Sequence, residues 1–174
     1  MDIKLFSEIL EWRGDRFNLE LFDCDDFSKL KRVKQVYGFV FNNKGKILII
    51  RLPGKKEWCL PGGGPEKFDA DWKESLKREV IEEADVEIKE IKPFMFIISK
   101  CLSKNDSGAK EGIMLRAIAK VKNILPQTID PCTEAINERK FVSPKEFLKY
   151  CPWGKNGEIQ LKGALEIMKE LEGD

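Results

Sequence analysis

The sequence contains no histidine among its 174 residues. Ser-His and Cys-His catalysis need an imidazole base, and many zinc centres use imidazole ligands. The absence argues against all three and leaves acid–base chemistry to Asp, Glu, Lys, Tyr or Cys. The five cysteines are scattered, odd in number and form no Cys-x-x-Cys pair. This spacing favours free thiols in a reducing cytoplasm over a disulfide framework.

Long apolar segments are also missing. The longest runs, such as Ile47 to Ile50 and Phe94 to Ile98, are far too short to span a bilayer. Asp2, Glu8 and Glu11 interrupt the N-terminus, which therefore does not resemble a signal peptide. We expect a cytoplasmic protein without a membrane partner.

Charge of one sign is not in excess either, because the formal net charge is only +1. There is no bulk field to attract nucleic acid or a membrane surface. An enzyme acting on RNA ends would need a basic groove, to which Lys29 to Arg32 and Lys55-Lys56 contribute only locally. We therefore do not expect a nucleic-acid partner.

What the sequence does contain is a globular composition, with 42% hydrophobic and 35% charged residues. Without repeats or low-complexity linkers, its length suits one domain with a sizeable core. We expect strands at 36–42, 46–52, 86–99, 113–121 and 140–142. We expect helices at 72–84, from residue 144 onward, and at about 160–171. Strands interleaved with helices predict an α/β or α+β fold.

The first residues are harder to assign. Segments 4–12 and 16–22 flank a Gly14-Asp15 turn signal and could form a hairpin. The first segment could equally form a short helix.

The predicted helix at 72–84 crowds three carboxylates together. Glu79, Glu82 and Glu83 fall within an arc of about 100° that borders the apolar stripe from Leu76 to Ala84. Such like charges repel, and partial burial raises the cost. A solvated acidic face is one reading of the pattern, and a site for a hard divalent cation is the other.

A glycine run at 62–64 precedes this helix. Glycine lets the backbone approach a ligand closely, and phosphate-bound Mg²⁺ usually takes one or two carboxylates plus substrate oxygens. The combination suits diphosphate chemistry. It is not a Walker loop, because no Gly-Lys-Ser/Thr follows.

These residues resemble the Nudix box, G-x5-E-x7-R-E-U-x-E-E-x-G-U, where U is a bulky aliphatic. The run from Arg78 to Val86 matches its second half except at Asp85, where the family has Gly, and Trp58 to Gly64 with Glu66 resembles its usual lead-in. The resemblance covers roughly 35–150. It implies a Nudix-like α/β/α sandwich with a mixed central sheet, with a Nudix domain at 35–174 and an N-terminal extension, a hairpin or dimer arm, at 1–34.

The first half of the box departs from the pattern. Counting from Gly64 puts Ala70 at the position of the family's Glu, whereas counting from Gly63 puts Asp69 there and leaves one inserted residue near Ala70. We prefer the second alignment, in which Phe68 replaces a usual Gly and Asp71 is the helix N-cap. Asp85 should adopt a left-handed conformation at the helix end, which Asp tolerates better than most residues.

The resemblance implies hydrolysis of a nucleoside diphosphate derivative with Mg²⁺ or Mn²⁺. Glu79, Glu82 and Glu83 would be metal ligands, together with the Gly62 carbonyl. Glu82 and Glu83 would also be catalytic, with Arg78 orienting a box carboxylate.

The resemblance also implies that the general base is a box Glu or a Glu on the loop before the strand at 140–142. Glu134 is the first loop candidate, then Glu138, with Glu111 a weaker third. The remaining roles rest on position. The expected substrate-binding residues are Arg51, Trp58, Gly63, Gly64 and Arg116. Each role has a competing interpretation. Arg51 and Arg116 could be plain surface charges, and Trp58 could pack in the core. The loop glutamates could be solvated charges without a catalytic role.

The box does not encode the substrate, which would be a nucleoside triphosphate, nucleotide sugar, ADP-ribose or dinucleoside polyphosphate. The departures at Phe68, Ala70 and Asp85 motivate an alternative, a catalytically impaired Nudix domain that binds a nucleotide or partner. The expected partner is a small nucleotide, with a homodimer as a further candidate.

Overall fold

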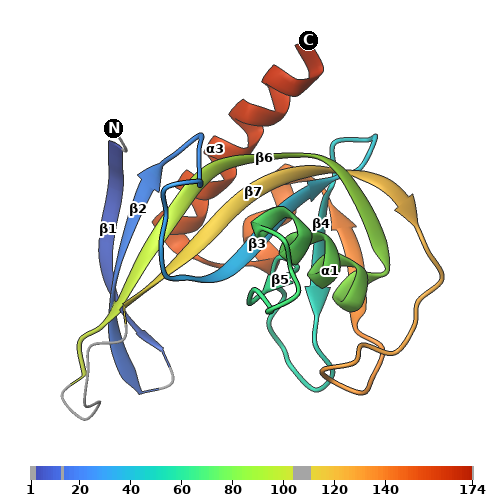
Figure 1. The fold of residues 1–174 in the computed structure, drawn as a ribbon, viewed down its shortest axis with the longest axis horizontal. Helices are drawn as coiled ribbons and strands as arrows, with labels where there is room; N and C mark the ends of the chain where they lie inside the picture. Colours follow the sequence, from blue (N-terminus) through green and yellow to red (C-terminus); the bar gives the residue numbers. More distant parts are fainter. Residues whose placement is uncertain (1–2, 13, 104–110, 174) are drawn as a thin grey trace.

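A single mixed β-sheet runs through the whole molecule (Figure 1). The structure, a computed structural model, describes residues 3–12, 14–103 and 111–173. Its elements are β1 (Ile3–Trp12), β2 (Asp15–Asp23), β3 (Val33–Phe41), β4 (Ile47–Arg51), β5 (Gly62–Gly63), α1 (Trp72–Ala84), β6 (Val86–Cys101), β7 (Glu111–Ile124), β8 (Glu138–Val142), α2 (Pro144–Tyr150) and α3 (Gly154–Gly173). The strand order is β1-β2-β6-β7-β3-β4-β8, and β5 pairs with β3. Because β3 and β7 are parallel and the other pairs antiparallel, the predicted mixed sheet is confirmed.

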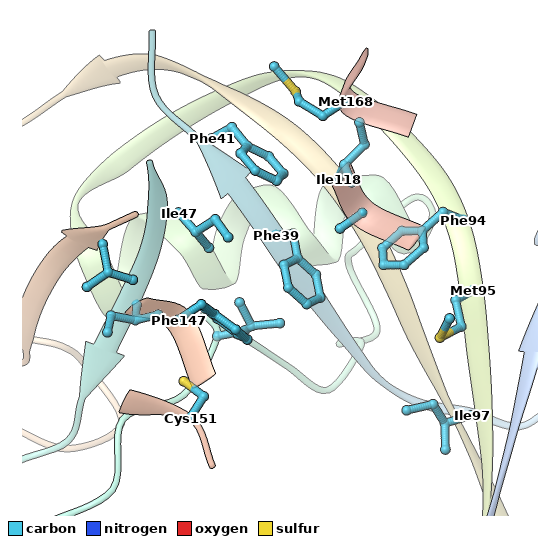
Figure 2. Close-up of a cluster of buried hydrophobic side chains, with 14 of the residues drawn as sticks. Phe39, Phe41, Ile47, Phe94, Met95, Ile97, Ile118, Phe147, Cys151 and Met168 are labelled. Atoms are coloured by element: carbon cyan, nitrogen blue, oxygen red, sulfur yellow. The ribbon is translucent and has the colours of Figure 1, made fainter. Parts of the chain in front are cut away.

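Helices cover both faces of the central strands (Figure 1). Phe39 and Phe41 of β3 pack with α2 and α3, whereas Val36 and Val40 pack on the opposite face with α1. Figure 2 shows the first cluster, in which the Phe39 ring lies 5.3 Å from that of Phe147. Burial on both faces explains why these strands are continuous apolar runs without polar alternation.

Helix α1 begins and ends as the sequence predicts. The Asp71 carboxylate accepts hydrogen bonds from the backbone N–H groups of Lys73 and Glu74, at 2.8 and 3.0 Å. At the other end Asp85 has φ 50° and ψ 46°, the expected left-handed conformation. These two residues fix the length of the helix that carries the carboxylates.

The N-terminal segment is a hairpin that widens the sheet. β1 pairs antiparallel with β2, and β2 pairs with β6, so the helical alternative for the first segment is wrong. The division of the chain into an extension at 1–34 and a domain at 35–174 stays a prediction. Within the described residues, no helix combines the length and apolar character needed to cross a membrane.

Helix α3 begins at Gly154, earlier than the predicted start near Gln160. Gly154, Asn156 and Gly157 have low helix propensity, which hid this first turn from the sequence pattern. Packing requires one of these glycines, because a Cβ at Gly157 would lie 2.9 Å from side-chain atoms of Leu148 and Trp153.

Candidate active site

The glycine loop is pressed against the sheet. Gly62 and Gly63 pair with Tyr37 and Val36 of β3. Gly62 has φ +146°, and a Cβ there would overlap the Val36 carbonyl oxygen and the Tyr37 backbone. Only glycine fits this position, and it places the loop backbone beside α1.

Two of the predicted carboxylates lie directly on this backbone. The Gly62 N–H donates a 2.7 Å hydrogen bond to the Glu83 carboxylate. A Cβ at Gly63 would lie 2.5 Å from Glu79 Oε1. The structure thus brings together the glycine loop and the carboxylate helix, which the sequence could only place in succession.

Arg78 lies at the centre of the carboxylates and uses every part of its guanidinium. Nη1 donates to Glu79 at 3.0 Å and to Glu82 at 3.1 Å. Nη2 donates to the Gly64 carbonyl at 2.8 Å and, with Nε, to Asp69 at 3.0 and 3.2 Å. Glu66 is a looser partner of Arg78, at 3.6 Å.

The contact with Asp69 bears on how the box is aligned. The Asp69 side chain is only 5% exposed and also accepts a 2.8 Å hydrogen bond from the Glu66 N–H. The Arg78 hydrogen bonds lower the pKa of this carboxyl to about 2. Asp69, and not its neighbour Ala70, therefore carries the charge that pairs with Arg78, in agreement with the preferred alignment.

The cluster has more negative than positive charge. Burial raises the pKa of Glu83 to about 8, with Glu79, Asp130 and Glu82 adding to the effect. Burial also raises the pKa of Glu79, although Arg78 opposes the shift. Hard oxygen donors with uncompensated charge have the chemistry that Mg²⁺ or Mn²⁺ prefers.

The geometry is that of carboxylates held by an arginine. In the described part of the chain, no group of three or more His, Cys, Asp or Glu side chains is arranged to hold a metal ion. Glu79 and Glu82 share Nη1 of Arg78, while Glu83 is turned to the Gly62 amide. The donor set fits a divalent cation chemically, and binding one would require these side chains to exchange partners.

The loop between β7 and β8 is fastened to the end of α1. The Asp85 carboxylate accepts hydrogen bonds from the N–H and the hydroxyl of Thr128, at 2.9 and 2.6 Å. Asn137 donates to the Glu83 carbonyl at 3.2 Å, and Arg139 to the Ala84 carbonyl at 2.6 Å. Sequence reasoning missed these contacts because each joins residues at least 43 positions apart.

The three loop glutamates have different surroundings. Glu134 lies in this fastened loop at φ 53°, exposed to solvent, and its N–H donates to the Asp130 carbonyl at 2.9 Å. Glu138 begins β8 and is paired with Arg51, at 2.6 and 2.7 Å. Glu111 begins β7 opposite Lys100, and no described hydrogen bond joins it to α1 or to the glycine loop.

Arg51 and Trp58 form a second group, separate from the box residues. The Arg51 guanidinium lies 4.9 Å from the centre of the Trp58 ring, and the Lys140 ammonium lies 5.0 Å from it. The Trp58 ring also packs edge-on against Tyr150. In these contacts Trp58 packs between two cations and against an aromatic ring.

Arg116 lies in neither group. It is buried on β7 with its guanidinium 4.8 Å from the centre of the Tyr37 ring, and its Nε donates to Gln160 of α3 at 2.6 Å. Burial lowers its pKa to about 10. It lines a cavity of about 440 Å³, which we name the Arg116 cavity, and an adjoining one of about 430 Å³. No sequence signal marks Tyr37 or Gln160 as its partners.

Comparison with known proteins places most of the chain in one family. The NUDIX domain family matches residues 31–159. No curated protein matches the sequence.

Solved structures share the fold at low sequence identity. The Bacillus subtilis pyrophosphohydrolase BsRppH, in a mutant form, is 18% identical with a TM-score of 0.67, over 93% of this chain and 97% of that one. A MutT protein from Bacillus halodurans is 17% identical with a TM-score of 0.51, over 74% and 78%. A UDP-X diphosphatase is 18% identical with a TM-score of 0.53, over 80% and 65%. The α+β sandwich expected from the sequence is thereby confirmed.

Proposed function

The chain belongs to the NUDIX family, and we propose that this Nudix-type pyrophosphohydrolase uses Mg²⁺ or Mn²⁺ to hydrolyse a diphosphate linkage in a nucleoside diphosphate derivative. One observation carries the proposal. Glu79 and Glu83 lie on the backbone of the glycine loop, in a cluster whose only cation among the described residues is Arg78. A negatively charged diphosphate would not enter such a cluster without a cation to neutralise it.

In this proposal Glu79, Glu82, Glu83 and the Gly62 carbonyl hold the divalent ion. The bound ion would neutralise charge on the diphosphate and lower the pKa of water. Arg78 gathers the Glu79 and Glu82 side chains beside the glycine loop and fastens the loop through the Gly64 carbonyl. The backbone at Gly63 and Gly64 would lie along the substrate.

Glu134 is the preferred loop candidate for the general base, beside Glu82 and Glu83 of the box. The Glu138 carboxylate already accepts hydrogen bonds from Arg51, at 2.6 and 2.7 Å. Glu134 has no such cation in the described residues, and its loop is fastened to α1 through Asp85 and Asn137. A base contributes about 10²- to 10⁴-fold to a rate.

The substrate class stays open among nucleoside triphosphates, nucleotide sugars, ADP-ribose and dinucleoside polyphosphates. Cytoplasmic location and a homodimer stay predictions. For a dimer, β1 offers an edge strand on which Ile3, Leu5 and Ile9 are 64%, 44% and 57% exposed.

The test is release of phosphate or nucleotide from a panel of these four classes, with Mg²⁺ and separately with Mn²⁺. Wild-type protein is compared with Glu82→Gln and with Glu74→Gln, a control on the same helix whose carboxylate is paired with Lys77. We expect turnover that Glu82→Gln abolishes and Glu74→Gln preserves. Unchanged turnover in Glu82→Gln would show the site assignment to be wrong.

A second candidate is a binding module without turnover. It is favoured by the lack, in the described residues, of a ready three-ligand group. If no panel member is hydrolysed while calorimetry still detects binding of the metal and a nucleotide, the binding module replaces the enzyme.

A further inference from the structure

Arg116 is a buried cation without an acidic partner in the part of the chain that the structure describes. It is 7% exposed, and no carboxylate in the described residues forms an ion pair with it. Taking a charge out of water without a partner is costly. A buried, unpaired arginine at the wall of a cavity therefore calls for a ligand that accepts its hydrogen bonds.

Only two of the five N–H donors of this arginine have hydrogen-bond partners among the described residues. Nε donates to Gln160 at 2.6 Å, and Nη1 donates to the Leu115 carbonyl at 3.1 Å. Nη2 has no hydrogen-bond partner among the described residues, and neither does the second N–H of Nη1. A guanidinium has five N–H donors in a fixed plane. The edge formed by Nη1 and Nη2 is therefore left to bind two acceptors side by side.

The orientation of Arg116 is set through the N-terminal hairpin. Gln160 donates to Asn156 on the same helix, and Asn156 donates to the Glu8 carboxylate of β1 at 2.8 Å. All three links are between side chains, and Gln160 and Asn156 are buried. The chain of hydrogen bonds fixes the Arg116 edge and joins it to a strand outside the part that matches the family, 31–159.

The hairpin also builds the wall of the Arg116 cavity. Leu10, Phe17 and Leu19 line it from β1 and β2, facing Tyr37 and Met114 from the sheet. The volume of about 440 Å³ lies within the range of about 300–1,000 Å³ typical of small-ligand sites. Apolar and aromatic walls around one fork of donors suit a flat, neutral ring with acceptors on its edge.

The walls argue against a bare phosphate at this arginine. The adjoining cavity, which Arg116 also lines, carries the carboxylates of Glu8 and Glu11. These would repel an anion, whereas an uncharged ring would feel little of their charge. The occupant favoured by the charges is a nucleobase.

One residue of the cavity wall also contacts the glycine loop of the box. Tyr37 contacts Arg116 with its ring and pairs with Gly62 in the sheet, and Gly62 donates to Glu83. A nucleoside whose base lies on Arg116 would thus direct its diphosphate towards the glycine loop.

We propose that the Arg116 cavity binds the base of the substrate and that Arg116 selects guanine through its adjacent N7 and O6 acceptors. The assignment rests on the proposed function for the position of the diphosphate. Guanine offers two acceptors side by side, whereas adenine puts an amino donor next to N7. That donor would face the donors of Arg116. A bicyclic ring also contacts more of the apolar wall formed by Leu10, Phe17 and Leu19 than a pyrimidine does.

The test separates base recognition from hydrolysis. Calorimetry without metal compares GMP, IMP, AMP, CMP and 7-deaza-GMP, none of which contains a diphosphate to be cleaved. GMP and IMP share both acceptors and should bind at least about tenfold tighter than AMP and 7-deaza-GMP. CMP, whose O2 and N3 are also adjacent acceptors, tests the contribution of the larger ring and should bind more weakly than GMP. Equal affinities, or a preference for AMP or CMP, would overturn the proposal. Selective binding of GMP, together with no hydrolysis of any member of the substrate panel, would support the base site and overturn the proposed hydrolysis instead.

Two variants assign the selectivity to its residues. Arg116→Lys keeps the charge but loses the fork, so the ratio of GMP to AMP affinity should fall towards one. Leu10→Ala opens the hairpin wall and should weaken both nucleotides by a similar factor, leaving the ratio unchanged. If Arg116→Lys does not fold, the 7-deaza-GMP comparison in the wild-type protein still decides. Full affinity for 7-deaza-GMP would refute recognition of N7.

Discussion

Arg78 and Arg116 are both enclosed by the protein, yet their neighbours are opposite. Arg78 is surrounded by Glu66, Asp69, Glu79 and Glu82. Arg116 has amide, carbonyl and aromatic neighbours and no acid in the described residues. An arginine whose donors are all used within the protein can only organise its neighbours, whereas one with donors to spare can bind a ligand. In our proposals, the two residues thus divide the candidate site into a charged half around Arg78 and a base-binding half around Arg116.

The largest expected effect comes from disturbing the charged half without changing a charge. Gly63→Ala puts a Cβ 2.5 Å from Glu79 Oε1, so the Glu79 carboxylate must move. A displacement of about 1 Å can cost about 100-fold in rate. We expect kcat/KM to fall by about that factor, as measured by steady-state kinetics on the best panel substrate.

Gly64→Ala is the matched comparison, because a Cβ there meets only the Lys34 carbonyl oxygen, at 3.4 Å. Its effect on kcat/KM should be at least about ten times smaller than that of Gly63→Ala. Equal losses in the two variants would mean that Glu79 does not act at this loop.

Arg78→Lys tests whether the organising role needs the fork of an arginine. Lysine keeps the charge but cannot reach Asp69, Glu79, Glu82 and the Gly64 carbonyl together. Loss of such a supporting partner costs about 10- to 100-fold in activity. We expect kcat to fall within that range while circular dichroism stays unchanged. Full activity in Arg78→Lys would mean that only the positive charge of Arg78 matters and not its set of hydrogen bonds.

Asp69→Asn should show a stability loss that depends on pH. The pKa of Asp69 is lowered to about 2 in the fold, whereas an unfolded Asp titrates near 3.9. A lowered pKa contributes stability above the unfolded value, and this is lost as pH falls towards about 2.

The free energy of unfolding of Asp69→Asn should therefore be about 1–2 kcal/mol lower at pH 7, by denaturant titration. The gap to the wild type should narrow below about pH 4. A gap that is constant from pH 7 to pH 3 would mean that the Asp69 charge contributes nothing.

The smallest expected effect concerns Asp85, which is the acidic counterpart of Arg116: a buried carboxylate with no ion pair in the described residues. It depends on the Thr128 hydroxyl, at 2.6 Å. Thr128→Val should lower the free energy of unfolding by about 1 kcal/mol and speed amide exchange in the loop after β7.

Thr133→Val is the control in the same loop, where the hydroxyl makes only a 3.4 Å contact with the Ala135 carbonyl. Thr133→Val should lower the free energy of unfolding by less than about half of the change caused by Thr128→Val. Similar losses from both substitutions would place the effect in the loop as a whole.

Local chemistry made much of the fold predictable. Asp71 and Asp85 mark the two ends of α1 by properties of single residues, namely a side-chain acceptor and tolerance of a left-handed backbone. The apolar stretches gave the central strands. The first turn of α3 escaped because Gly154 and Gly157 oppose a helix locally, and only close packing against Trp153 explains the glycine at 157.

Within the candidate site, too, features set by neighbouring residues could be predicted, whereas contacts between distant residues could not. The sequence by itself determined a carboxylate helix after a glycine loop, because both follow from spacing along one short stretch. Only the tertiary structure decided that Asp69 pairs with Arg78, that Arg51 pairs with Glu138, and that Arg116 faces a cavity walled by the N-terminal hairpin. The cause is physical: the partner of a charge is set by which strands and helices lie side by side, and sheet pairing joins residues far apart in the chain.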